Sequence, residues 1–250
     1  MLKELSRRDW LSLLNLPEAM VPRILILRGT RNLKAGYEKH KTYFKDVREL
    51  NSPNDIFEDI FIGTHDDTLF GYASVYGDAM ASEVVHLFGV LGTRIVIQTG
   101  CCGALAENML PGDIVCPTFA YCGEGASRYY LPGHDKIEAS SELVDSIKSS
   151  EVAPLTLHKG PVWTTSALLA EGKAEIQKWR EQGFIAVDME TAATFSVAKY
   201  FKMKRLSLLF VFDNPGQGGH LLLTDAQQKA RRLSGEQTII DLALNFGVKS

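Results

Sequence analysis

Short apolar runs alternate with amphipathic segments along the whole chain, and this alternation is the clearest structural signal in the sequence. Residues 24–27 (ILIL), 93–98 and 206–212 are apolar or β-branched over lengths typical of buried strands. Further strands are predicted at 55–63, 68–76, 113–120, 155–164 and 184–187. Apolar residues at helical spacing predict helices at 2–16, 33–44, 79–92, 140–150, 171–182, 189–200 and 224–245. The pattern predicts an α/β fold, a three-layer α/β/α sandwich around a mixed, largely parallel central sheet.

The same pattern contains no internal repeat, low-complexity tract or linker, so we predict a single domain that spans residues 1–250. Hydrophobic residues (45%) and charged residues (23%) have the proportions of an ordinary soluble protein, and the net charge of −3 gives no reason to expect binding to nucleic acid or a membrane. No apolar run reaches about 18 residues, and the N-terminus lacks the layout of a signal peptide. A cytoplasmic protein is therefore expected.

The four cysteines, Cys101, Cys102, Cys116 and Cys122, do not have the spacing of a zinc site. Without a secretory signal, they are interpreted as buried free thiols. The sequence also lacks the common motifs for nucleotide phosphates, serine hydrolases and zinc proteases. We therefore expect neither a metal nor an organic cofactor.

Polar or glycine-containing segments follow several predicted strands, at the position where open α/β sheets bind ligands. Residues 28–31 (RGTR) combine a glycine, which lets the backbone approach a ligand, with two arginines that can hold an anion. Residues 99–103 (TGCCG) space two glycines so that backbone N–H groups would be exposed. Residues 164–166 (TTS) carry three hydroxyls, and residues 212–216 (FDNPG) present a carboxylate. Each segment also has a structural interpretation, as a turn or a helix cap.

Residues 186–200 carry the fifth such junction, in which two carboxylates stand between a strand and a helix. The carboxylates are Asp188 and Glu190, and small residues follow them at helical spacing. Either carboxylate could cap the helix or complement its dipole. The other strand ends favour a second interpretation, in which this junction faces the same cleft as they do.

Taken in order, these junctions resemble the nucleoside phosphorylase family of purine and uridine phosphorylases and their hydrolase relatives. The resemblance runs from Pro22 to about Gly247. It rests most on residues 98–105 (QTGCCGAL), 111–115 (PGDIV) and 187–193 (VDMETAA), and residues 123–127 (GEGAS) are similar to a further loop of the family. It implies cleavage of the N-glycosidic bond of a nucleoside by inorganic phosphate, which releases a free base and a (deoxy)ribose 1-phosphate.

The resemblance also implies a role for individual residues. Glu190 matches the carboxylate that accepts hydrogen bonds from the ribose 2′- and 3′-hydroxyls, which steadies an oxocarbenium-like transition state. Met189 would pack against the sugar. Asp213 matches the aspartate that protonates or hydrogen-bonds the leaving base in purine-cleaving members, a role that requires a raised pKa or a partner. Gly29 matches the glycine of the phosphate loop.

Two positions depart from the phosphorylase pattern. The arginine of the first loop, Arg31, comes two residues early, and Gln98 stands where phosphorylases place a second arginine. Either Arg28 and Arg31 replace the missing charges, or water replaces phosphate and the protein is a nucleoside hydrolase. The implied phosphate or water site consists of Gly29, Arg28, Arg31, Gln98, Gly100 and Cys101.

The base pocket implied by the resemblance contains Trp163, Thr165, Leu168 and Asp213. Residues 129–130, two tyrosines, are further candidates for its apolar wall. Trp163 has an equally plausible role in the core. A uridine-specific insert after residue 166 is missing and Asp213 is retained, so a purine is favoured over uracil.

The family forms its sites across a dimer interface, so the resemblance implies a homo-oligomer, either a dimer or a hexamer built from dimers. It implies a small-molecule nucleoside as the ligand. Because a fold does not guarantee an activity, a catalytically inactive nucleoside-binding protein on the same fold remains a third interpretation.

Overall fold

The computed structural model describes residues 1–50, 57–222 and 225–246. The start of the strand predicted at 55–63, Thr224 at the start of the last predicted helix, and Gly247 lie outside these residues. The strands are β1 (Ile24–Gly29), β2 (Lys45–Glu49), β3 (Ile60–His65), β4 (Thr68–Val75), β5 (Ile95–Ala104), β6 (Ile114–Gly123), β7 (Lys136–Glu138), β8 (Leu157–Thr165), β9 (Ala186–Asp188) and β10 (Lys204–Asp213). The helices are α1 (Arg7–Leu13), α2 (Leu33–Lys41), α3 (Gly77–Leu91), α4 (Ser127–Tyr130), α5 (Ser141–Ser146), α6 (Lys173–Glu181), α7 (Thr191–Tyr200) and α8 (Ala226–Asn245).

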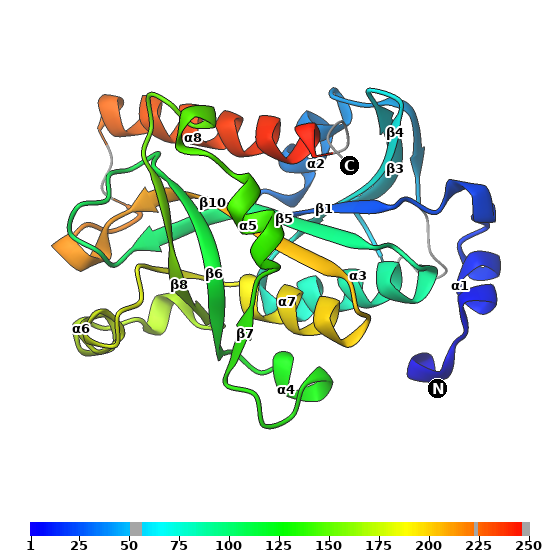
Figure 1. Ribbon diagram of the computed structural model, residues 1–250, viewed down its shortest axis with the longest axis horizontal. Helices are drawn as coiled ribbons and strands as arrows, with labels where there is room; N and C mark the ends of the chain where they lie inside the picture. The colour runs from blue at the N-terminus through cyan, green and yellow to red at the C-terminus, as the bar shows by residue number, and fades with distance from the viewer. Residues whose placement is uncertain (51–56, 223–224, 247–250) are drawn as a thin grey trace.

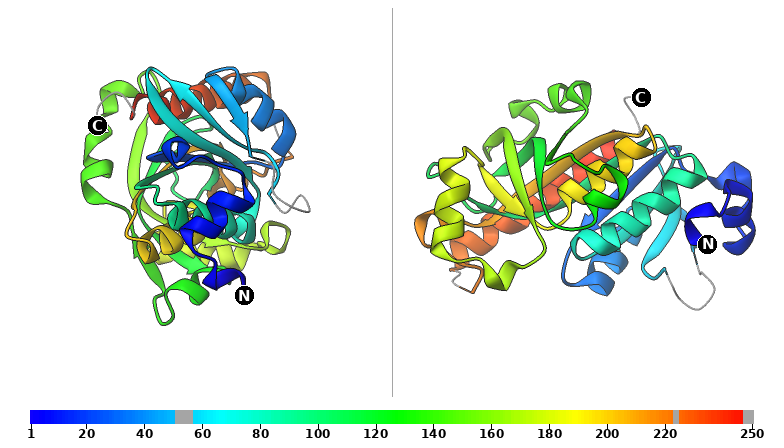
Figure 2. Two further views of the ribbon diagram at one scale, coloured as in Figure 1. Left: turned by 90° about the vertical axis from the view of Figure 1, so that its right-hand side faces the viewer. Right: turned by 90° about the horizontal axis from the view of Figure 1, so that it is seen from below.

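All of these strands belong to one 10-stranded mixed sheet. Its centre is parallel, with β1 between β4 and β5, and β10 on the far side of β5. Figure 1 shows α8 and α2 on one side of this sheet and α3 and α7 on the other, and Figure 2 shows α3 and α7 side by side. The layered α/β/α fold predicted from the sequence is confirmed.

Part of the sheet closes on itself. β5 pairs with both β10 and β9, and the order β10, β6, β8, β9 completes a ring of strands. This closure places the ends of β5, β9 and β10 next to one another. The residues that follow or end these strands are therefore brought together in space.

Burial explains the strand pattern of the sequence. Every residue of β1 is buried, because β4 and β5 flank it and helices cover both faces of the sheet. α7 is buried from Thr191 to Ala198 and consists mainly of small residues, which lets it lie between α3 and the sheet.

The structure corrects several sequence-based boundaries. Residues 99–103, predicted as a loop, continue β5, because β10 and β9 supply hydrogen-bonding partners there. The helix predicted at 2–16 divides into a short turn at Leu2–Glu4 and α1. The strands β2 and β7 were not predicted, because β2 has no buried residue and β7 has only three residues. Among the described residues, no helix is both long and apolar enough to cross a bilayer.

Candidate active site

Asp188 fixes the junction between β9 and α7. Its carboxylate accepts hydrogen bonds from the Thr164 hydroxyl at 2.7 Å and from the Thr191 backbone N–H at 2.8 Å. It also accepts hydrogen bonds from the Glu190 backbone N–H at 3.2 Å and from the Gln98 amide at 3.1 Å. The helix-capping role considered for this junction therefore belongs to Asp188, and the side chain of Glu190 is left available.

Glu190 lies in a pocket made by two glycines. Its Oε1 accepts a hydrogen bond from the Gly77 backbone N–H at 2.8 Å, and Gly77 has φ +81°, a conformation that favours glycine. Its Oε2 lies so close to Gly29 that a Cβ added there would stand 2.8 Å from it. Glu190 is 5% exposed and is held between the end of β1 and the start of α3. A hydroxyl pair presented to this carboxylate would meet a fixed acceptor.

The environment of Glu190 favours its protonated form. Burial raises the pKa of Glu190 to about 8, and the neighbouring Asp188 carboxylate adds to the rise, whereas the Gly77 N–H and the Arg28 guanidinium oppose it. Ionisation of Glu190 thus depends on what binds beside it. Hydrogen bonds from two ribose hydroxyls would stabilise the ionised form.

We expect the thermal stability of the protein to fall as the pH rises from about 5 to about 8. The folded state keeps a proton on Glu190 in this window that the unfolded state has lost, so stability is greatest below the window and decreases across it. Across the same pH range, the Tm of the variant Glu190→Gln should fall by at least about 5 °C less than the Tm of the wild type. The variant Glu83→Gln, at an exposed carboxyl on α3, should behave as the wild type. Parallel pH profiles for all three proteins would contradict this environment for Glu190.

The contact between Gly29 and Glu190 gives a second prediction. In the variant Gly29→Ala, the new methyl group would displace the carboxylate, and kcat/KM should fall by about 100-fold. The variant Gly125→Ala is the control, because a Cβ at Gly125 meets no atom within 4 Å. Steady-state kinetics of both variants test the contact, and a Gly29→Ala enzyme within twofold of wild type would show that Glu190 is not positioned by Gly29.

Arg28 follows the apolar part of β1 and is buried beneath this pocket. Its Nη2 donates to Glu236 Oε1 of α8 at 2.6 Å, and Glu236 also pairs with Lys39 at 3.0 Å. Burial alone would raise the pKa of Glu236, but the two cations outweigh it and the pKa is lowered. The Nη1 atom of Arg28 is buried and has no hydrogen-bond partner among the described residues. Arg28 therefore keeps donor capacity while most of its charge is balanced by Glu236.

The other residues of the predicted phosphate or water site divide into two groups. Gly100 lies against Gly29, with the carbonyl oxygen of Gly29 3.4 Å from where a Cβ of Gly100 would stand. Arg31 is exposed at the rim, and its guanidinium lies 4.8 Å from the centre of the Tyr76 ring. Gln98 is fully buried and its amide is bound to Asp188, so it supports the junction from below. The structure thus does not bring Gln98 to the surface of the pocket.

Cys101 directly follows Gly100 on β5. Its side chain is exposed, which corrects the prediction of a buried thiol, while Cys102, Cys116 and Cys122 are buried free thiols. Desolvation of the thiol nevertheless raises the pKa of Cys101 to about 11; Glu190 and Asp213 add to the rise, and Arg28 opposes it. At this pKa the thiol is neutral near pH 7 and is not a nucleophile.

Asp213 ends β10 beside Gly103 of β5. The pairing of β10 with β5 shifts between Val211 and Asp213, so Phe212 is an extra residue that redirects the chain. The Oδ1 atom of Asp213 lies 3.3 Å from where a Cβ of Gly103 would stand. Burial raises the pKa of Asp213, and Arg232 and His220 offset part of the rise. Gly100 and Gly103 are three residues apart on β5, so the two carboxylates face positions about 10 Å apart.

A second carboxyl beside Asp213 was missed in the sequence. Burial raises the pKa of Glu171 to about 7, and Asp213 contributes to the rise. The Oε1 atom of Glu171 is buried without a hydrogen-bond partner among the described residues. The sequence placed Glu171 on a surface helix, but α6 begins only at Lys173. The only signal in the sequence was the position of Glu171 as the first residue of the predicted helix.

The predicted base pocket is only partly assembled around Asp213. Trp163 stacks between Tyr121 and Trp179, with ring centroids 4.2 and 5.1 Å away, which is a packing role. Thr165 is buried and accepts a hydrogen bond from the Ala167 N–H at 3.2 Å, and Leu168 is half-buried in the turn that follows. Met189 is half-buried directly before Glu190. The structure brings Glu190, Gly29, Gly100, Cys101 and Asp213 together, and it records no contact of Trp163 with Asp213.

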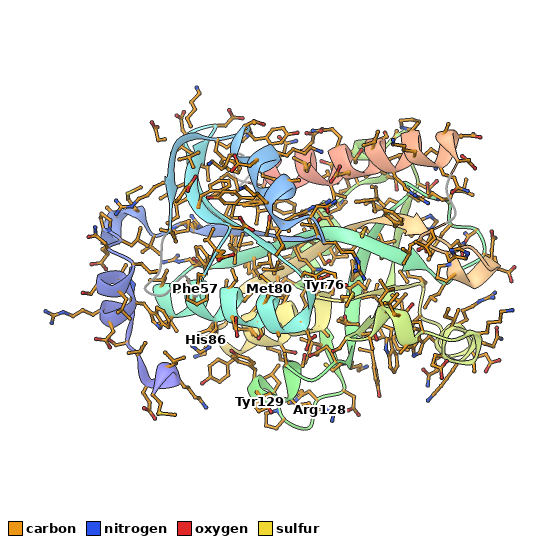
Figure 3. All side chains as sticks on the ribbon, turned by 180° about the vertical axis from the view of Figure 1, so that it is seen from behind. Phe57, Tyr76, Met80, His86, Arg128 and Tyr129 are labelled. Carbon is orange, nitrogen blue, oxygen red and sulfur yellow. The ribbon has the colours of Figure 1, made fainter. Side chains whose placement is uncertain are left out.

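The two tyrosines considered for the base pocket lie elsewhere. The Tyr130 ring packs against His86 and Tyr200, and Tyr129 is 86% exposed. Figure 3 shows Met80 and His86 along α3 with Tyr129 beside them. His86, Tyr129, Tyr130 and Tyr200 line a separate cavity of about 580 Å³. The tyrosines therefore form no wall for a base beside Asp213.

Comparison with known proteins agrees with this geometry. Residues 45–244 match the family described as the phosphorylase superfamily. The chain belongs to this superfamily. Its nucleoside phosphorylase branch is indicated by a guanosine phosphorylase of Halorubrum lacusprofundi, which is 28% identical over 127 residues, 49% of this chain and only 52% of the relative. A purine nucleoside phosphorylase of the DeoD type from Vibrio vulnificus is 26% identical over 195 residues, 75% of this chain and 80% of the relative.

The superfamily fold is also seen in solved structures. The uridine phosphorylase of Vibrio fischeri ES114 superposes with a TM-score of 0.76 at 20% identity, covering 93% of this chain and 95% of that one. At this identity the likeness concerns the fold. Within the superfamily, the resemblance to nucleoside phosphorylases found in the sequence is confirmed.

Proposed function

We propose that this protein cleaves the N-glycosidic bond of a purine nucleoside by phosphorolysis, which yields a free base and a pentose 1-phosphate. The observation that carries the proposal is the buried Glu190 carboxylate, which is fixed by Gly77 against Gly29. Asp213, a carboxyl with a raised pKa, lies farther along β5, beside Gly103. A sugar held at Glu190 would place its base toward Asp213.

The chemistry follows from these two carboxyls. Glu190 accepts hydrogen bonds from the 2′- and 3′-hydroxyls and, once ionised, stabilises the positive charge that develops on the ribose ring. Asp213 donates its proton to the departing base, and its raised pKa favours the protonated form that this step needs. Phosphate would approach C1′ from the side of Gly29, Gly100 and Arg28. Guanosine and purine nucleoside phosphorylases among the relatives support a purine substrate.

Hydrolysis is the second candidate, and two observations favour it. Arg28 is already paired with Glu236 at 2.6 Å, and Gln98 donates to Asp188 where phosphorylases place an arginine. With the arginine charge balanced internally, a neutral water could take the place of phosphate. The pentose would then be released free.

Base release measured with and without inorganic phosphate separates the two reactions. Phosphorolysis predicts that release depends on phosphate and that the sugar product is a pentose 1-phosphate. Phosphate-independent release with free pentose as product would establish hydrolysis instead. The variant Glu236→Gln removes the charge that balances Arg28, so it should lower the KM for phosphate if phosphate binds beside Arg28.

A further inference from the structure

A second cavity, of about 700 Å³, lies at the end of the sheet opposite to Glu190. It is located where β1, β5 and β10 begin, while the candidate active site is located where they end. The six residues of β1 separate the two regions by about 20 Å. Figure 1 shows α5 and the last turn of α8 near this end of the sheet, and residues of both line the cavity. No residue of the candidate active site contributes to it.

Four cations line this cavity, and three of them begin adjacent strands. The Arg94 N–H donates to the Arg23 carbonyl at 3.0 Å, and the Lys204 N–H donates to the Arg94 carbonyl at 2.8 Å. Arg23 and Arg94 are therefore level on neighbouring strands about 5 Å apart, and Lys204 lies on the other side of β5, one residue farther along, beside Ile95. Lys202 is the fourth cation, and among the described residues that line the cavity Glu151 is the one acid. The cavity thus gathers like charges that repel one another unless an anion is present.

Little of this charge is balanced within the described part of the chain. Lys204 pairs with Glu142 at 3.1 Å, but both side chains are more than half exposed, and such pairs contribute little. Across residues 1–50, 57–222 and 225–246, no hydrogen bond or ion pair is recorded for the side chains of Arg23, Arg94 and Lys202. Arg23, Arg94 and Lys202 are exposed side chains that line the cavity, so their charges are available to an anion that enters it.

The backbone of Lys202 is an independent sign that the cation is needed there. Lys202 follows the end of α7 and has φ +58°. This left-handed conformation is common after a helix, where glycine usually adopts it. The next N–H, that of Met203, bonds back to the Ala198 carbonyl at 2.8 Å, as in the usual glycine-ended motif. A lysine at this position is strained relative to glycine. A lysine thus occupies a backbone position that favours glycine.

The remaining lining residues are largely apolar. Leu143 and Ile147 come from α5 and the residue after it, and Leu242 and Phe246 come from the end of α8. An aromatic ring and branched side chains beside a cationic rim suit a ligand with an anionic group and a flat apolar part. We propose that this cavity binds an organic phosphate that carries an aromatic ring, with the phosphate at Arg23, Arg94 and Lys204.

Calorimetric titration of the whole protein with adenosine 5′-monophosphate tests the proposal. We expect saturable binding that weakens with added salt, and weaker binding of ribose 5-phosphate, which lacks the ring. The variants Arg23→Gln and Arg94→Gln should each weaken binding by at least about tenfold. The variant Lys229→Gln, at an exposed cation on α8 outside the cavity, should bind as the wild type does.

The variant Lys202→Gly distinguishes a ligand contact from a structural lysine. Glycine suits the backbone, so the Tm should stay the same or rise, while the affinity for adenosine 5′-monophosphate falls several-fold. No binding at millimolar ligand would overturn the proposal. Binding that is unchanged by Arg94→Gln but lost in Glu190→Gln would also overturn it, because the ligand would then occupy the candidate active site.

Discussion

Replacing Glu190 by glutamine is expected to lower kcat by roughly two to four decades, the loss that follows removal of a key electrostatic contact to a transition state. Glutamine keeps the volume and an oxygen that can accept from the Gly77 N–H, so the pocket should remain intact. It lacks the negative charge that stabilises the oxocarbenium-like ribose. Steady-state kinetics of base release measure the effect.

The same variant also tests the interpretation of an inactive binding protein. If the chain only binds nucleosides, wild type and variant will both show no base release while binding persists. The control Glu83→Gln should retain wild-type turnover. A Glu190→Gln enzyme within about tenfold of wild type would remove Glu190 from the catalytic role.

Replacing Asp213 by asparagine is expected to lower kcat for an ordinary purine nucleoside by about 100- to 10,000-fold. The expected loss is that of a general acid, because asparagine cannot give a proton to the departing base. Burial raises the pKa of Asp213 and so favours the protonated acid in the wild type. The rate of purine release is the measurement.

A substrate whose base needs no proton provides the matched comparison. In 7-methylguanosine the purine already carries a positive charge, so its release should be nearly unaffected by Asp213→Asn. The variant Asp135→Asn, at an exposed aspartate, should leave both rates unchanged. Equal losses on both nucleosides would show that Asp213 positions the substrate and does not protonate it.

The central strands could be predicted from the sequence because burial on both faces leaves a continuous apolar run, as in β1. The closure of the ring could not be predicted. It depends on the pairing of β5 with β10 and β9, strands about a hundred residues later in the chain. The glycines and cysteines at 99–103 locally predict a loop. In the structure their backbone groups form hydrogen bonds with β10 and β9, which lie far along the sequence.

Site residues that stand at strand ends could be predicted from the sequence, whereas contacts between residues far apart in the chain could not. Glu190 and Asp213 stand directly at strand ends, so a junction pattern locates them. The partner of Arg28, Glu236, is 208 residues away, and the face of α8 that carries it has no local signature. Gln98 was assigned to the nucleophile site by position alone, whereas its amide is held by Asp188, a residue of another strand. Glu171 was missed because its raised pKa results from burial, which the local sequence does not show.

A crystal structure of the protein with a carbon-linked nucleoside analogue, whose glycosidic bond is not cleaved, tests the central claim most directly. We predict that the ribose 2′- and 3′-hydroxyls lie within about 3 Å of the Glu190 carboxylate and that the base lies beside Asp213. An analogue bound elsewhere, with Glu190 still held only by Gly77, would contradict the assignment of this site.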